Sequence, residues 1–236
     1  MILAYFSFHI TRDGEVFTPI GEGEVILDSG TYEAFQLPEF ALSMIDSNYK
    51  SYFIEVEPGL KVHVLETGRG FPVFLMHGNP TSGFLYRKVV QSLPLDEVRV
   101  IMPTSPGLGF SSKIPASQHT LENHIRWINT VLEKLELTEL VYAGQDWGGP
   151  IGMGALSLSP NLLKGAVLLN TGFNAPTINT DISPAHAIVK TPVVGELILE
   201  VFFSIFDRLG RVQGDPESWT PKIAELYGKP LYDDGN

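Results

Sequence analysis

We predict an α/β fold with a mostly parallel sheet from two features of the chain. A β-hairpin signal comes first, with alternating apolar runs on either side of Glu57-Pro58-Gly59. Short apolar strand patterns then alternate with helical patterns, which is typical of parallel sheets covered by crossover helices. The 236 residues are enough for one domain with a sizeable core.

Each element is predicted from its residue pattern. The hairpin strands are expected at Tyr52–Val56 and Leu60–Leu65. Apolar residues recur at helical spacing over Leu121–Glu136, and a second helix is completed by Gly152–Ser159. Short apolar runs predict four further strands, at Pro72–Met76, Val98–Met102, Leu140–Ala143 and Ala166–Leu169.

We divide the chain into three parts. Residues 1–36 are an N-terminal extension of unclear role, with short strands expected near Ile2–Ile10 and Glu24–Leu27. Residues 37–175 carry the alternating pattern and form the α/β core. Residues 176–236 form a helical cap over the sheet edge, because helical runs replace strands there, at Ala187–Val189, Val193–Phe206 and Pro221–Tyr227.

Composition excludes several classes of partner and site. Lys and Arg number 16 against 27 Asp and Glu, and the net charge of −11 argues against binding to nucleic acid or an anionic membrane. The chain has no cysteine, so disulfides and thiolate metal sites are excluded. The apolar start has no basic region typical of a signal peptide, and we expect a cytoplasmic protein. Nothing in the sequence defines an oligomeric state.

The segment Gly144-Gln145-Asp146-Trp147-Gly148-Gly149 carries the strongest functional signal. It follows a predicted strand and leads into a predicted helix, with small residues two places before and after Asp146. This is the nucleophile-elbow pattern of hydrolases, with Asp where Ser is usual. A helix N-cap is the other interpretation of an Asp here, and the flanking glycines and Trp147 favour the nucleophile.

A second motif, His77-Gly78-Asn79-Pro80-Thr81-Ser82-Gly83, directly follows the Pro72–Met76 strand. In α/β-hydrolases the loop at this place supplies one donor of the oxyanion hole, and the residue after the nucleophile supplies the other. These positions are Asn79 and Trp147 in this chain. A third loop, Pro103–Ser112, follows the Val98–Met102 strand, and ligands bind where such strands end.

These motifs resemble those of the haloalkane dehalogenases of the α/β-hydrolase superfamily, and the resemblance extends from about Leu37 to Tyr232. It implies that Asp146 attacks the carbon bearing the halogen and forms a covalent ester. The side chains of Asn79 and Trp147 would hold the halide, while their backbone N–H groups would form the oxyanion hole. The partners implied are a small halogenated substrate, water and a halide ion, with no cofactor and no metal.

Two alternatives remain open. Epoxide hydrolases have an aromatic residue at the position of Asn79 and use cap tyrosines, for which Tyr227 and Tyr232 are candidates. Fluoroacetate dehalogenases share the Asp elbow but usually carry Arg at the position of Trp147, so this chain differs from them there. The other alternative is a non-catalytic hydrolase fragment that only binds small apolar molecules or a partner chain.

The chain departs from the family pattern where the ester would be hydrolysed. That step needs a His base and an acid that orients it, both late in the family's chains. Asn170 stands where some members have the acid, and Thr104 replaces an Asp of the third loop. His77 belongs to the oxyanion loop and is assigned a structural role. No catalytic role is assigned to His63, His119, His124 or His186.

We therefore expect the C-terminal strands, the acid and the base to lie beyond Asn236, so that this chain forms the ester without turnover.

Overall fold

The computed structural model describes residues 16–46, 48–172, 206, 209 and 214–232. Within them, one eight-stranded sheet has the order β1-β2-β3-β4-β6-β5-β7-β8. The α/β fold and all predicted strands in these ranges are confirmed. The strands are β1 (Glu24–Leu27), β2 (Gly30–Ala34), β3 (Lys50–Glu57), β4 (Leu60–Gly68), β5 (Phe71–Met76), β6 (Val98–Pro103), β7 (Leu140–Gln145) and β8 (Leu163–Leu169).

The sheet is antiparallel at its start and parallel where the functional motifs lie. Strands β1 to β4 form an antiparallel meander, and β4 pairs antiparallel with β6. Strand β5 then pairs parallel with both β6 and β7, and β7 pairs parallel with β8. The carboxyl ends of β5 to β8 therefore meet at one edge of the sheet, where such folds bind their ligands.

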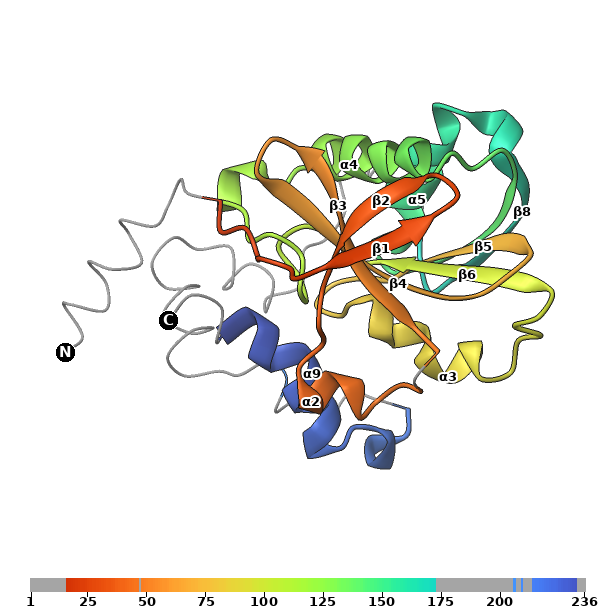
Figure 1. Ribbon diagram of the computed structural model, residues 1–236. Coiled ribbons are helices and arrows are strands. Elements are labelled where there is room, and N and C mark those ends of the chain that lie inside the picture. The colour runs from red at the N-terminus through yellow and green to blue at the C-terminus, as the bar shows by residue number, and fades with distance from the viewer. Residues whose placement is uncertain (1–15, 47, 173–205, 207–208, 210–213, 233–236) are drawn as a thin grey trace, which may run out of the picture.

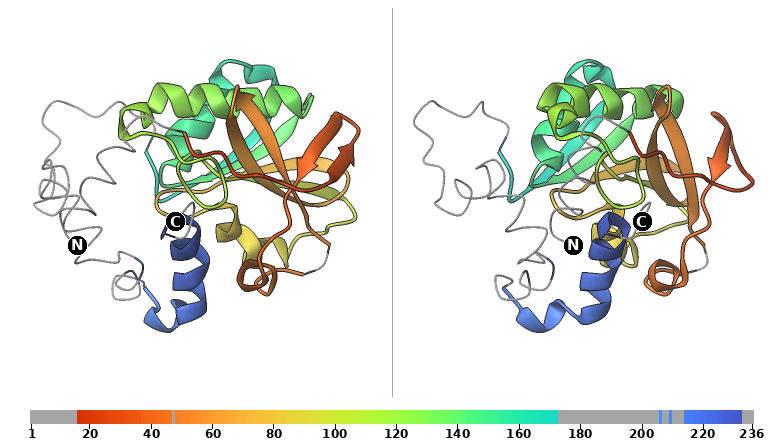
Figure 2. Two further views of the ribbon diagram at one scale, coloured as in Figure 1. Left: turned by 60° about the vertical axis from the view of Figure 1, so that its left-hand side comes forward. Right: turned by 90° about the vertical axis from the view of Figure 1, so that its left-hand side faces the viewer.

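Helices cover both faces of the sheet (Figure 1). On one face lie α4 (Leu121–Lys134) and α5 (Gly148–Ser157), and on the other lie α2 (Glu39–Leu42), α3 (Arg87–Val90) and α9 (Pro221–Tyr232). The two views of Figure 2 show the same three layers. None of the helices in the described ranges has the length and apolar content needed to cross a bilayer.

The N-terminal hairpin β1–β2 extends the sheet beyond β3. Strand β1 matches the predicted strand at Glu24–Leu27, whereas β2 was not predicted. The segment before the hairpin also contacts the chain that follows β6. There Phe17 and Lys113 exchange two backbone hydrogen bonds, of 3.0 and 2.8 Å. The ammonium of Lys61 donates to the carbonyl of Pro19 at 3.1 Å. Part of the N-terminal extension is thus tied to β4 and to Lys113, directly after the third loop.

The predicted cap is only partly within the described residues. Helix α9 begins at Pro221, as predicted, and continues to Tyr232. It buries Ile223, Leu226 and Tyr227 in the core cluster shared with α2 and α3. The predicted strand at Ile2–Ile10, the helical run at Ala187–Val189 and nearly all of the Val193–Phe206 run lie outside the described residues. The three-part division of the chain therefore stays a prediction.

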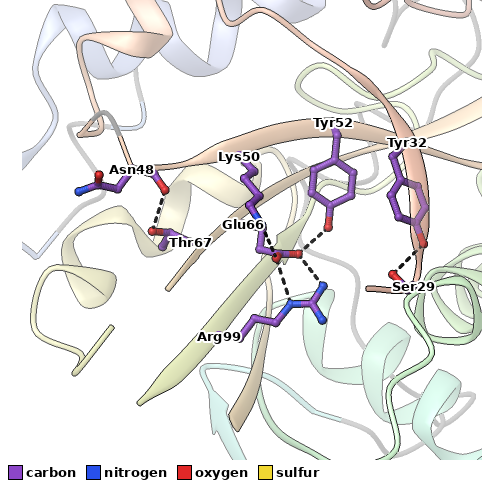
Figure 3. Close-up of polar contacts among 8 residues, drawn as sticks. All are labelled: Ser29, Tyr32, Asn48, Lys50, Tyr52, Glu66, Thr67 and Arg99. Carbon is purple, nitrogen blue, oxygen red and sulfur yellow. Dashed lines mark hydrogen bonds and ion pairs between the residues drawn. The ribbon is translucent and has the colours of Figure 1, made fainter. Parts of the chain in front are cut away.

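A buried ion pair joins β3, β4 and β6 (Figure 3). The Glu66 carboxylate accepts bonds from Arg99 Nε at 3.0 Å and Arg99 Nη2 at 2.8 Å, and from the Tyr52 hydroxyl at 2.7 Å. Burial, followed by the charge of Glu66, raises the pKa of Tyr52. Since Arg99 lies near the start of β6, this network sits away from the carboxyl ends of the parallel strands. It stabilises the sheet and lies apart from the predicted site.

Candidate active site

Asp146 occupies a tight turn between β7 and α5. Its φ of 51° is in the left-handed region, which residues other than glycine rarely adopt. The Asp146 carbonyl accepts bonds from the Gly149 N–H at 3.1 Å and the Thr171 hydroxyl at 2.5 Å. A side chain at Gly148 would collide with the carbonyl of Met76. The strand–turn–helix predicted around Asp146 is present, with backbone strain at the residue proposed to react.

The loop after β5 contacts the Asp146 side chain directly. The backbone N–H of Asn79 donates to Asp146 Oδ1 at 2.9 Å. Gly78 makes this approach possible, because a Cβ there would overlap the Cβ and carboxylate of Asp146. Strands β5 and β7 are parallel neighbours, so the turns at their carboxyl ends lie side by side. Two motifs 67 residues apart in sequence therefore meet at one carboxylate.

His77 links the loops after β5 and β6. Its Nδ1 is 2.7 Å from the carbonyl of Gly78, and its Nε2 is 3.0 Å from the backbone N–H of Ser105, which donates to it. The ring is then neutral, with its proton on Nδ1. Burial lowers the pKa of His77 to about 4, against the opposing effects of Gly78 and the Asp146 charge. Both ring nitrogens are occupied, which supports the structural role assigned to His77.

Buried histidines should make this protein sensitive to mild acid. Burial lowers the pKa of His63 to about 3 and the pKa values of His77 and His124 to about 4, from 6.5. Between pH 6.5 and about 4 the unfolded chain binds protons that the folded chain does not. We expect the free energy of unfolding to fall as pH falls through this window. The slope should approach about 1.4 kcal/mol per pH unit for each histidine.

Urea unfolding measured every half pH unit checks this expectation. Above pH 5 most carboxylates stay ionised, so the slope there reports histidines. The His77→Gln variant should show a shallower slope than the wild type. An unfolding free energy that does not change between pH 6.5 and 5 would contradict the expectation.

A cavity of about 220 Å³ opens at the carboxyl ends of the parallel strands. Asn79 and Trp147 both line it. The Trp147 side chain is 50% exposed, so core packing does not account for it. The remaining lining comes from three places, the loop after β5 (His77, Gly78), the loop after β6 (Ser105, Pro106, Leu108) and the helices α4 and α5 with the segment before α4 (His119, Thr120, Leu121, His124, Ile151).

The sequence provides no reason to assign His119 and His124 a role in the site. Both nevertheless line the cavity, and His124 is only 9% exposed. His119 Nδ1 lies 3.4 Å from His124 Nε2. Burial lowers the pKa of both rings. In the sequence the two histidines stand five residues apart, on either side of Thr120, the N-cap of α4. That spacing does not show that the start of the helix lies beside the cavity.

Three other positions named in the sequence analysis lie outside the cavity lining. Thr104 is fully buried and its hydroxyl accepts from the Gly83 N–H at 3.1 Å, so it is a structural residue of the third loop. Asn170 directly follows β8, is exposed and has a φ of 43°. The Tyr227 hydroxyl accepts from Arg87 at 3.4 Å in the buried cluster on the other face and does not line the cavity. Within the described ranges no three side chains form a metal-ligand group.

Comparison with known proteins agrees with this architecture. A family model described as "alpha/beta hydrolase fold" matches residues 72–211. The chain belongs to this family. As an α/β-hydrolase, it is 36% identical over 139 residues to a haloalkane dehalogenase of Psychrobacter cryohalolentis, covering 54% of this chain and 46% of the relative.

Two further relatives carry different names. The α/β-hydrolase chain is 38% identical over 190 residues to a cis-3-alkyl-4-alkyloxetan-2-one decarboxylase of Shewanella oneidensis, covering 78% of this chain and 58% of that one. Bifunctional epoxide hydrolase 2 of Sus scrofa is 31% identical over 163 residues, covering 68% of this chain and 29% of the relative. The chain spans about half the length of the haloalkane dehalogenases it matches.

A solved structure shows the same fold. The haloalkane dehalogenase DatA of Agrobacterium tumefaciens superposes with a TM-score of 0.64 at 25% identity, covering 80% of this α/β-hydrolase chain and 66% of its own. The resemblance to haloalkane dehalogenases drawn from the motifs is therefore confirmed.

Proposed function

We propose that this α/β-hydrolase acts by displacement of halide, with Asp146 as the nucleophile. One observation carries the proposal. The Asp146 carboxylate is held by the Asn79 N–H at 2.9 Å, in a turn whose next residue, Trp147, lines a cavity together with Asn79. Asp146 itself is not among the residues that line this cavity, but it lies directly against them, between the Asn79 backbone and Trp147, at the carboxyl ends of adjacent strands.

In the proposed first step, an Asp146 carboxylate oxygen forms a bond to the carbon that bears the halogen. The carbon–halogen bond breaks and its electron pair leaves with the halide, so that an alkyl ester of Asp146 remains. The amide of Asn79 and the indole N–H of Trp147 would donate to the departing halide. Because charge grows on the halogen as the bond breaks, these donors act most strongly in the transition state.

Hydrolysis of that ester needs a base to activate water. His77 is unsuited to this role, since both of its nitrogens are already hydrogen-bonded. Among the described residues, no histidine nitrogen is hydrogen-bonded to Asp146. We therefore expect the purified chain to accumulate the alkyl ester.

Intact-protein mass spectrometry after incubation with 1-bromobutane tests the proposal. We expect a mass increase of one butyl group for each C–Br bond broken, on the peptide that contains Asp146. Bromide release that continues far beyond one equivalent would contradict the expected accumulation. No adduct and no bromide would contradict the displacement itself and favour a protein that only binds.

The Shewanella relative favours a second candidate, because its alignment covers 78% of this chain against 54% for the Psychrobacter dehalogenase. In an oxetan-2-one, attack of Asp146 on the ring carbon would break its C–O bond and leave a carboxylate on the substrate. Loss of CO2 would then form an alkene and release Asp146, without water or a base.

Incubation with cis-3,4-dimethyloxetan-2-one separates the two candidates. Alkene and CO2 formed over many turnovers, with no butyl adduct from 1-bromobutane, would favour the oxetanone. The epoxide hydrolase alternative loses one of its two candidate tyrosines, because Tyr227 is hydrogen-bonded to Arg87 away from the cavity; the side chain of Tyr232 lies outside the described residues.

A further inference from the structure

Two histidines line the cavity and have no part in the proposed displacement. His119 and His124 share it with Asn79 and Trp147. Their Nδ1 and Nε2 atoms are 3.4 Å apart, with ring centroids 5.5 Å apart and planes inclined by 35°. This is a hydrogen-bonded imidazole pair within the same small space as the proposed halide donors.

The pair is uncharged at neutral pH and keeps hydrogen-bonding capacity. Burial lowers the pKa of His119, and burial with the neighbouring His119 and His77 lowers that of His124 to about 4. Each neutral imidazole has one donor and one acceptor. The shared bond joins His119 Nδ1 to His124 Nε2, so His119 Nε2 and His124 Nδ1 remain. His124 Nδ1 is buried and has no hydrogen-bond partner among the described residues. His119 Nε2 is therefore the nitrogen left for a ligand, as donor or acceptor according to which ring carries the shared proton.

The other cavity walls are mainly apolar and offer less to a polar group. Leu108, Leu121 and Ile151 contribute aliphatic surface. The hydroxyl of Thr120 already accepts from the Asn123 N–H at 3.2 Å, as the N-cap of α4. The cavity, at about 220 Å³, is below the usual size for drug-like ligands, so it suits a short chain. A plain haloalkane in it would offer the imidazole pair no hydrogen bond, which is unfavourable wherever it displaces water from the pair.

We propose that the substrate of this site carries a hydroxyl group on its carbon chain, bound by the His119–His124 pair, and is thus a short halogenated alcohol. A hydroxyl both donates and accepts, so it matches the pair in either protonation arrangement. The inference rests on the proposed function, in which Asp146 forms the C–O bond and bromide or chloride leaves.

A matched pair of substrates tests the inference. 3-Bromopropan-1-ol and 1-bromobutane have the same number of heavy atoms and differ in OH against CH3. For each compound, the second-order rate constant for alkylation of Asp146 is divided by that for its reaction with acetate in water, which removes the difference in intrinsic reactivity. The quotient for the alcohol is then divided by the quotient for the alkane. We expect the alcohol-to-alkane ratio to fall about tenfold in His119→Leu, the usual value of one hydrogen bond. His119→Gln, which keeps a donor and an acceptor, should retain most of the preference.

A second measurement does not depend on the reaction. In the Asp146→Asn variant, titration with 3-bromopropan-1-ol should shift the imidazole nitrogen resonances of His119 and His124, and 1-bromobutane should not. Since His124 is largely buried, His119 is the primary variant and His124→Leu the second. Equal rate ratios in wild type and His119→Leu would overturn the inference. If no adduct forms with either compound, the proposed function fails, and the resonances alone decide whether the pair binds the alcohol.

Discussion

Replacement of Asp146 by Asn should remove the alkyl-enzyme, with alkylation by 1-bromobutane at least about a thousandfold slower than in the wild type. A carboxamide is a far weaker nucleophile than a carboxylate, so the first bond would not form. Asn is well tolerated at a φ of 51°, so the turn and the fold should persist. Intact mass spectrometry measures the adduct, and thermal unfolding shows that the variant is folded.

Asp96→Asn provides the matched control, because Asp96 is exposed and does not line the cavity. It should form the adduct at the wild-type rate. If Asp146→Asn is alkylated as fast as the wild type, the nucleophile is another residue.

Replacement of Arg99 by Met should lower the free energy of unfolding by about 3–5 kcal/mol. The Glu66 side chain is 3% exposed and takes two hydrogen bonds from Arg99. Removing the guanidinium leaves a buried carboxylate whose remaining polar partners among the described residues are the Tyr52 hydroxyl and Lys50 Nζ at 4.0 Å. An unpaired buried charge is much less stable than the pair. Urea unfolding at neutral pH measures the loss.

Two further variants separate this effect from the loss of any arginine. Arg126→Met breaks an exposed ion pair, in which the side chains of Arg126 and Glu57 are 54% and 37% exposed. It should lower the free energy of unfolding by less than about 1 kcal/mol. The double variant Arg99→Met with Glu66→Gln should recover much of the stability, because the buried charge is gone. Equal losses for Arg99→Met and Arg126→Met would show that burial of Glu66 does not set the cost.

The sequence pattern was enough to predict the parallel core, because buried strands there are short apolar runs bounded by turn residues. Strand β2 escaped prediction, since its alternation is limited to Tyr32 and Ala34 and it is half exposed near the sheet edge. Helix α5 begins at Gly148, directly after the turn, although its early glycines have low helix propensity. Here tertiary contacts override local preference.

The contact between Asn79 and Asp146 could be expected from the motifs, since their strands end at the same edge. His119 and His124 could not be placed in the cavity in the same way. Their position depends on how the chain returns from the loop after β6 to the start of α4, and Gly107 packs closely against His119 there. No local pattern in the sequence encodes that return. The part of a site contributed by strand ends is thus more predictable than the part contributed by loops.

The bond from the Asn79 N–H makes the two oxygens of Asp146 inequivalent before any substrate arrives. Oδ1 is the acceptor of that bond, so in the proposed displacement Oδ2 carries the attacking lone pair. Oδ1 then becomes the carbonyl oxygen of the ester and already lies against a donor for the charge it would gain on hydrolysis. A single backbone amide thus assigns two chemically identical atoms to different steps of one reaction.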